Sequence, residues 1–367
     1  MTAADDEWPS PFDLPQPAEE EHQEPAEEEH QAVDPYADVP FVPAEDEVVP
    51  IRPGADTVAQ LLSDYRLDLG ALLDPNRPPR EWVIHGLIPA GASVSIVAPA
   101  GVGKSLLVLS AMLGVARGDR AWADLSIPRP RRVLYVDMEN TADDLAERLP
   151  ALGVRRGDDL AGLVYLHLPT ILPPLDTLRG GAVLAAVVNA AALDPGDVVV
   201  LDSWQRVVRG PENDSDTMRA FYACTGAGLK RRRLTVIRTD NAGKDAERGA
   251  RGTSGKRDDV DLELLLARGK GRPGRMTLTP SKTRLPDVHP LTVEMSTADD
   301  DGRVVYSAGN DPRRAQVIAA LQLLDEKGVD PGLAVRRVWE GVGAAATAAG
   351  VPRWAVREAQ KERASCA

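Results

Sequence analysis

The residues best suited to chemistry in this sequence stand in one stretch, Val94-Ser-Ile-Val-Ala-Pro-Ala-Gly-Val-Gly-Lys-Ser105. Its apolar start predicts a buried strand over 94–97, and a helix is predicted to open at Lys104 and to run to Gly118. A glycine-rich loop between a strand and a helix directs backbone N–H groups at an anion. Lys104 would neutralise the β- and γ-phosphates of ATP, and the Ser105 hydroxyl would bind Mg²⁺.

This stretch is a phosphate-binding loop in pattern, with one departure: Ala98 stands where the pattern has its first glycine. The alternative is a chance turn rich in glycine and alanine, but the strand before it and the helix after it supply the context that the pattern requires. The predicted nucleotide-binding residues are Ala98, Pro99, Ala100, Gly101, Val102, Gly103, Lys104, Ser105 and Leu106.

A second candidate group is the carboxylate that ends the apolar run Val198-Val-Val-Leu-Asp202. Such runs are common, so Asp202 alone would indicate little. Downstream of a phosphate-binding loop, however, its carboxylate can bind the water shell of Mg²⁺ opposite Ser105. We therefore predict a metal site formed by Ser105 and Asp202.

The elements that must position these groups alternate between strand and helix. Apolar runs predict strands at 94–97, 132–138, 164–168, 198–202 and 234–241, with helices at 104–118, from Thr141, at 178–192 and up to Lys230. Further strands are predicted at 262–266, 275–280, 291–295 and 303–307, and a leading helix at 56–75. This alternation predicts an α/β core with a mostly parallel central sheet and antiparallel additions over 56–308.

The ends of the chain differ from this core in composition. Residues 1–50 carry 16 acidic and no basic side chains and repeat Pro-Ala-Glu-Glu-Glu-His-Gln, so a disordered acidic tail is expected over 1–55. It would be a solvated spacer or an acidic partner-binding arm. Residues 309–367 predict three helices, the last with Arg353, Arg357 and Lys361 on one face. This module is either a DNA-binding helix-turn-helix or a small helical cap.

Composition excludes several other classes of protein. No apolar run reaches the roughly 20 residues that span a bilayer, so no membrane partner is expected. The first thirty residues are acidic and do not resemble a secretory signal. Two cysteines without metal-ligand spacing give no disulfide framework, which favours a cytoplasmic location.

Several segments together resemble the RecA-like hexameric ATPases, in particular the RepA-type replicative helicases of plasmids and phages, and more distantly DnaB, KaiC and RecA. They are Gly86-Leu-Ile-Pro-Ala-Gly91, the phosphate-binding loop, Leu134-Tyr-Val-Asp-Met-Glu139, Val199-Val-Leu-Asp-Ser203 and the basic and acidic run 243–261. The resemblance covers about 82–307. It implies a RecA-like fold, the cofactors ATP and Mg²⁺, and a homo-oligomer, usually a hexameric ring.

The resemblance also assigns roles within the site. Glu139 matches the glutamate that aligns the attacking water, and Asp202 matches the carboxylate on the Mg²⁺ side. Relatives carry a histidine pair as γ-phosphate sensor where this chain has Asp240-Asn241. This substitution is the largest departure from the family pattern.

Relatives supply a basic finger from a late strand to the neighbouring subunit. Lys282 and Arg284 fit its spacing, because alternate strand residues share a face. Arg251, Lys256 and Arg257 are rivals for that role. Loops 206–216 and 242–259 match DNA-gripping loops of relatives, and Lys244, Arg248, Arg251, Lys256 and Arg257 are the candidate contacts in the second loop. Four acidic residues nearly balance them, so single-stranded DNA binding is implied mainly by the resemblance.

The sequence therefore predicts an Mg²⁺-dependent ATPase, a helicase on single-stranded DNA of a plasmid, phage or mobile element. One alternative is a RecA-like recombinase that forms filaments. Another is a non-motor ATP-binding switch. A small-molecule kinase is disfavoured, because no substrate lid is evident and Glu139 suits a water nucleophile better than an acceptor hydroxyl.

Overall fold

The computed structural model describes residues 55–119, 121–211, 214–242, 259–269, 274–284, 288–298, 303–309 and 312–366. All of these residues belong to one compact unit, Ile51–Ala367. The predicted acidic tail lies outside the described residues except for its last position, Ala55.

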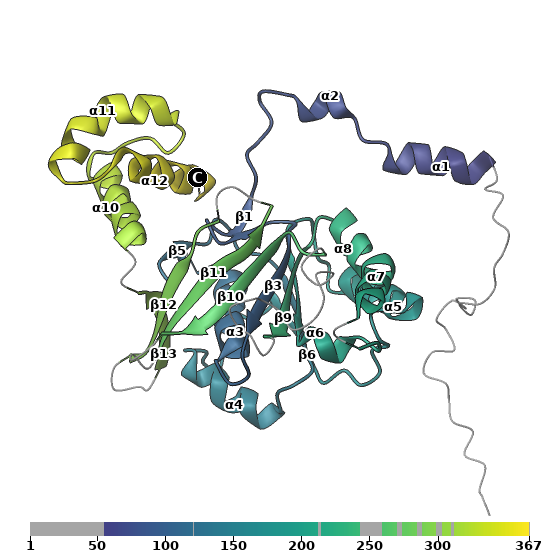
Figure 1. Ribbon diagram of the computed structural model, residues 1–367. Coiled ribbons are helices and arrows are strands. Elements are labelled where there is room, and N and C mark those ends of the chain that lie inside the picture. The colour runs from purple at the N-terminus through teal and green to yellow at the C-terminus, as the bar shows by residue number, and fades with distance from the viewer. Residues whose placement is uncertain are drawn as a thin grey trace, which may run out of the picture. The chain divides into compact units, whose positions relative to one another are not determined.

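The described residues form a sheet of nine strands in the order β13-β12-β11-β10-β3-β9-β8-β6-β7 (Figure 1). Neighbouring strands from β10 to β7 run parallel, and β11, β12 and β13 are added antiparallel. The strands are β3 (Ser93–Ala98), β6 (Val133–Asp137), β7 (Leu163–His167), β8 (Val198–Asp202), β9 (Thr235–Asn241), β10 (Leu262–Arg268), β11 (Arg275–Thr283), β12 (Leu291–Ala298) and β13 (Arg303–Ala308). The predicted fold class, an α/β core with a mostly parallel central sheet, is confirmed.

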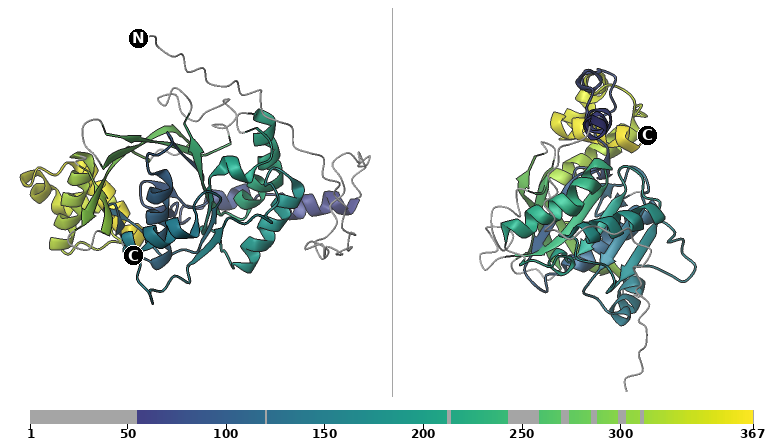
Figure 2. Two further views of the ribbon diagram at one scale, coloured as in Figure 1. Left: turned by 90° about the horizontal axis from the view of Figure 1, so that it is seen from below. Right: turned by 90° about the vertical axis from the view of Figure 1, so that its right-hand side faces the viewer.

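Helices cover both faces of the parallel part of the sheet (Figure 2). The central strands are rich in Val, Leu and Ile, and nearly all of their side chains are buried, as expected for a sheet covered on both faces. α3 (Lys104–Arg117) and α4 (Ala142–Ala151) pack on one face. The other face is covered by α5 (Leu178–Ala190), α6 (Trp204–Val207), α7 (Ser215–Phe221) and α8 (Ala227–Arg231). One π-helical turn, Tyr222–Gly226, joins α7 to α8 where a single helix was predicted.

The segment before the core differs from its prediction. A single helix was expected over 56–75, but the chain forms α1 (Ala55–Tyr65) and α2 (Leu69–Leu72). The reason is Asp68, whose side chain accepts the N–H groups of Gly70 and Ala71 and so starts a new helix. Two short hairpins follow, β1 (Trp82–Ile84) with β2 (Ile88–Pro89) and β4 (Ala121–Trp122) with β5 (Leu125–Ser126).

The C-terminal residues form the three predicted helices, α10 (Pro312–Glu326), α11 (Val335–Ala348) and α12 (Arg353–Cys366). They enclose a small core of their own around Leu324, Val338 and Ala359. The predicted DNA-reading role of this module stays a prediction. Within the described ranges, every helix is too short or too polar to cross a lipid bilayer.

Candidate functional site

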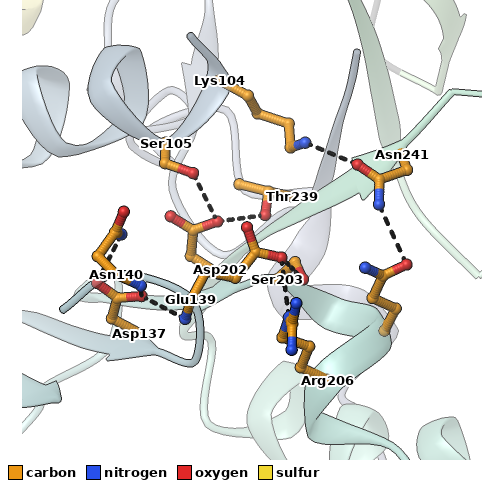
Figure 3. Close-up of polar contacts among 11 residues, drawn as sticks. Lys104, Ser105, Asp137, Glu139, Asn140, Asp202, Ser203, Arg206, Thr239 and Asn241 are labelled. Carbon is orange, nitrogen blue, oxygen red and sulfur yellow. Dashed lines mark hydrogen bonds and ion pairs between the residues drawn. The ribbon is translucent and has the colours of Figure 1, made fainter. Parts of the chain in front are cut away.

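The carboxyl ends of neighbouring parallel strands bring the predicted site residues together (Figure 3). β3 leads through the phosphate-binding loop into α3, and its last residue, Ala98, lies beside Asn241 at the end of β9. Likewise, Asp137 at the end of β6 lies beside Asp202 at the end of β8. Ligands of parallel α/β sheets bind at this edge, where loops meet helix N-termini.

The phosphate-binding loop is open on the side where an anion would lie. Gly101 and Gly103 adopt left-handed φ angles of 74° and 100°, which other residues rarely adopt. An added Cβ at either glycine would meet no atom within 4 Å. No side chain caps α3, so its first N–H groups are left for a ligand. The loop therefore fits a phosphate group.

Lys104 supplies the positive charge of the site. Lys104 is only 9% exposed, and its Nζ donates a hydrogen bond to Asn241 Oδ1 over 3.1 Å. Asn241 Nδ2 in turn donates to Gln205 Oε1 over 3.1 Å. Among the described residues no carboxylate pairs with Lys104, so its positive charge remains available for an anionic ligand.

The Asp202 carboxylate accepts hydrogen bonds from three hydroxyl groups. Its Oδ1 accepts Ser105 Oγ over 3.1 Å and Thr239 Oγ1 over 2.6 Å, and its Oδ2 accepts Tyr135 OH over 2.7 Å. Burial raises the pKa of Asp202, and the three hydroxyl donors oppose that rise by stabilising the carboxylate. Burial and the adjacent Asp202 charge likewise raise the pKa of Tyr135, which keeps its proton and donates.

Ser105 and Asp202 fit a Mg²⁺ ion bound together with a nucleotide. Mg²⁺ takes oxygen ligands and usually keeps several waters, so a hydroxyl and one carboxylate suffice on the protein side. The described part of the chain contains no cluster of three His, Cys, Asp or Glu that could hold a metal by itself. A metal at this position would therefore depend on phosphate and water for its other ligands.

Glu139 follows β6 in a turn held by Asp137. Asp137 Oδ1 accepts the N–H groups of Glu139 and Asn140 over 2.9 and 3.1 Å, and its other oxygen accepts Asn140 Nδ2 and Tyr165 OH. The Glu139 carboxylate accepts Ser203 Oγ and lies 3.3 Å from Arg206 Nε. It is thus partly exposed at the same sheet edge as Lys104, with a cation beside it.

The predicted sensor pair does not act as one unit. Asn241 contacts Lys104, but successive strand residues point to opposite faces, and Asp240 points away. On the other face of the sheet, Asp240 Oδ2 accepts hydrogen bonds from Ser95 Oγ over 2.6 Å and from Arg238 Nε over 3.1 Å. Only Asn241 of this pair reaches the phosphate-binding loop.

The predicted finger residues lie away from this chain's own site. Lys282 pairs with Glu263 near the amino end of β10, beside the start of β3, whereas the phosphate-binding loop follows the end of β3. Arg284 Nη1 lies 3.4 Å from Asp261 Oδ1 at the same edge. A role for both is therefore possible only towards another subunit.

The predicted DNA contacts fall in two places. Lys244, Arg248, Arg251, Lys256 and Arg257 lie outside the described residues. On α12, the three basic side chains share a face, but Glu358 lies 3.5 Å from Arg357 and 3.4 Å from Lys361. Arg353 lies over the Trp339 ring at 5.6 Å.

Three contributors to the site were missed by sequence reasoning. Tyr135 and Thr239 lie in apolar runs that indicate only buried strands, so no local signal marks them as partners of Asp202. Arg268 ends β10 and donates through Nη2 to Gly101 O over 2.8 Å and through Nε to Val102 O over 3.4 Å. Only the pairing of β10 with β3 could have placed it against the loop.

Comparison with known proteins gives a family and a structural likeness. The sequence matches the AAA domain family over residues 58–247, a range that includes Lys104, Glu139, Asp202 and Asn241. The fold is similar to the crystal structure of a KaiC-like protein from the hyperthermophilic archaeon Pyrococcus horikoshii OT3, with a TM-score of 0.45 and 14% identity. That likeness covers 63% of this chain and 99% of the other. No curated protein matches the sequence.

Proposed function

The chain belongs to the AAA domain family of P-loop ATPases, and from this premise we propose that it is an Mg²⁺-dependent ring motor on single-stranded DNA, a RepA-type helicase of a plasmid, phage or mobile element. The observation that carries the proposal is the convergence of Lys104, Ser105, Asp202 and Glu139 on one sheet edge around an open phosphate-binding loop. ATP hydrolysis needs groups that bind the phosphates, hold the metal and align the water at one place.

Each residue has a distinct task in this proposal. The loop N–H groups and Lys104 bind the phosphates and balance their charge. Ser105 and Asp202 would hold Mg²⁺, which supplies further charge stabilisation when bound. Glu139 orients the attacking water and accepts its proton, and its partial exposure leaves it accessible to that water. Asn241, in contact with Lys104, is placed to respond to the γ-phosphate.

Assembly would complete the site. Lys282 and Arg284 lie at the opposite sheet edge from this chain's loop, which suits a finger that reaches the next subunit. A cation supplied in this way stabilises charge in the transition state and makes hydrolysis depend on oligomerisation. Ring closure and DNA binding by loop 242–259 belong to the same proposal.

A non-motor ATP-binding switch is the second candidate, and a specific observation favours it. The Glu139 carboxylate is engaged by Ser203 and by Arg206, a residue of the loop expected to meet DNA. A carboxylate held by a hydroxyl donor and a cation must give up those contacts before it can accept a proton from water, which slows proton transfer. If this contact persists with ATP bound, the protein would bind nucleotide without turning it over.

ATP hydrolysis measured with and without single-stranded DNA separates the two functions. A motor should show DNA-stimulated turnover that falls at least about 100-fold in Glu139→Gln, because general base catalysis is lost. Lys104→Ala should weaken nucleotide binding itself. Tight ATP binding with negligible turnover, indifferent to DNA, would refute the motor and support the switch.

A further inference from the structure

A second cavity lies among the β1–β2 hairpin, β5, the start of β12 and the C-terminal helices α10 and α12. Its volume is about 530 Å³, and no residue of the phosphate-binding loop lines it. Cavities that hold small molecules in proteins usually measure about 300–1,000 Å³. The size therefore suits a small organic ligand.

The floor of this cavity is apolar. Five of its side chains are almost fully buried: Trp82, Leu87, Leu125, Leu291 and Val317. They come from the ATPase core and from α10, so the surface exists only where these elements meet. Removing an apolar group from water against such a surface is favourable.

The rim of the cavity is basic. Arg80, Arg313, Arg314 and Lys361 line it together with Glu358 and Glu362, so four cations stand against two carboxylates. Glu362 is already bound by Arg314 over 2.7 Å, and Lys361 lies 3.4 Å from Glu358. Burial lowers the pKa of His85, which lines the cavity as a neutral ring, so the described lining side chains carry a net charge of +2.

Arg314 is a built feature of the cavity wall. It is 9% exposed, its two terminal nitrogens bind the Glu362 carboxylate, and one of them also donates to Asp124 O. Its Nε–H is buried and has no acceptor among the described residues. Buried donors are nearly always satisfied, so this N–H group is an exception among the described residues.

We propose that this cavity binds a small organic anion, with an apolar body on the floor and a carboxylate, sulfonate or phosphate at the rim. The apolar floor accounts for the body, and the net positive charge of the described rim residues accounts for the anionic group. The site is separate from the ATP site and does not depend on the function proposed for it.

The test is a fluorescence titration of the full chain with 8-anilino-1-naphthalenesulfonate, which joins an aromatic body to an anion. N-phenyl-1-naphthylamine is the matched neutral probe, and 2-naphthoate is the competitor. We expect one saturable site that binds the anionic probe more tightly than the neutral probe. We also expect 2-naphthoate to displace the anionic probe from this site. Equal affinity for both probes, or failure of 2-naphthoate to compete, would overturn the proposal. Competition by an acidic peptide alone would assign the cavity to a peptide instead.

Variants assign the binding to this cavity. Arg80→Ala with Lys361→Ala should weaken the anionic probe about threefold to tenfold and leave the neutral probe unchanged. Arg336→Ala removes an equally basic but remote side chain of α11 and should change neither. Val317→Trp should fill the floor and abolish both. If circular dichroism shows that Val317→Trp does not fold, the variant with Arg80→Ala and Lys361→Ala tests the assignment by itself. Equal effects of the rim pair and Arg336→Ala would refute the assignment.

Discussion

Removing the Tyr135 hydroxyl should destabilise the protein more at neutral than at acidic pH. Tyr135 is 1% exposed, and its hydroxyl donates to Asp202 Oδ2 over 2.7 Å. Tyr135→Phe deletes this donor but keeps the ring, which stacks on Tyr165 with centroids 4.9 Å apart. The change therefore isolates one hydrogen bond to a buried carboxylate.

The size and sign of the effect follow from the ionisation of Asp202. Burial raises its folded-state pKa, so its contribution to stability is fully present below the unfolded pKa and is lost as pH rises through the folded pKa. Tyr135 opposes that loss by stabilising the carboxylate, and its removal raises the pKa further. A hydrogen bond to a charged group contributes about 1.5–3 kcal/mol and a neutral one about 0.5–1.5 kcal/mol. We expect the cost at neutral pH to exceed that at acidic pH by about 1.4 kcal/mol, one pKa unit.

The assay is urea unfolding at about pH 7 and about pH 4, without magnesium or nucleotide, so that only the protein's own contacts contribute. Tyr306→Phe is the matched control, because the buried Tyr306 hydroxyl has no hydrogen-bond partner among the described residues. That variant should be as stable as the parent or more so at both pH values. Equal, pH-independent changes in the two variants would refute the reasoning about Asp202.

Three further changes test the rest of the structure. Arg268→Met should weaken ATP binding about threefold to tenfold, because two carbonyl groups of the phosphate-binding loop lose their hydrogen-bond donor. Unchanged affinity in a nucleotide titration would contradict this. Asn241→Asp should weaken ATP binding more than Asn241→Ala in the same titration, because a carboxylate would pair with Lys104; the reverse order would contradict it. Arg314→Met should cost about 3–5 kcal/mol in urea unfolding by leaving Glu362 charged and buried, and Arg314→Met with Glu362→Leu should recover most of it; no recovery would contradict the buried pair.

The phosphate-binding loop shows how far local sequence reaches. Gly101, Gly103 and Lys104 stand at fixed spacing between an apolar run and a helix, and neighbouring residues alone determine that geometry. Thr141 and Asp144 likewise form the capping box that their spacing predicts. The α/β class followed from the alternation of strand and helix patterns, because each period is a local property of the chain.

The order of the strands in the sheet could not be predicted from local sequence. It depends on which apolar runs pair across long stretches of chain, and it placed Arg268 against the loop while moving Lys282 to the opposite edge. Side chains of β9 also alternate between the two faces of the sheet. This alternation separates Asp240 from Asn241, which their adjacent positions in the sequence had suggested as one sensor.

The sequence by itself indicated the phosphate-binding loop, the α/β class and most of the helices and strands, because these rest on residue type and short spacing. Tertiary structure alone decided which side chains meet. Tyr135 and Thr239 became partners of Asp202, and the C-terminal helices formed a basic, apolar-floored cavity with the core. Such contacts join residues far apart in the chain, so packing and strand order select them rather than any local pattern.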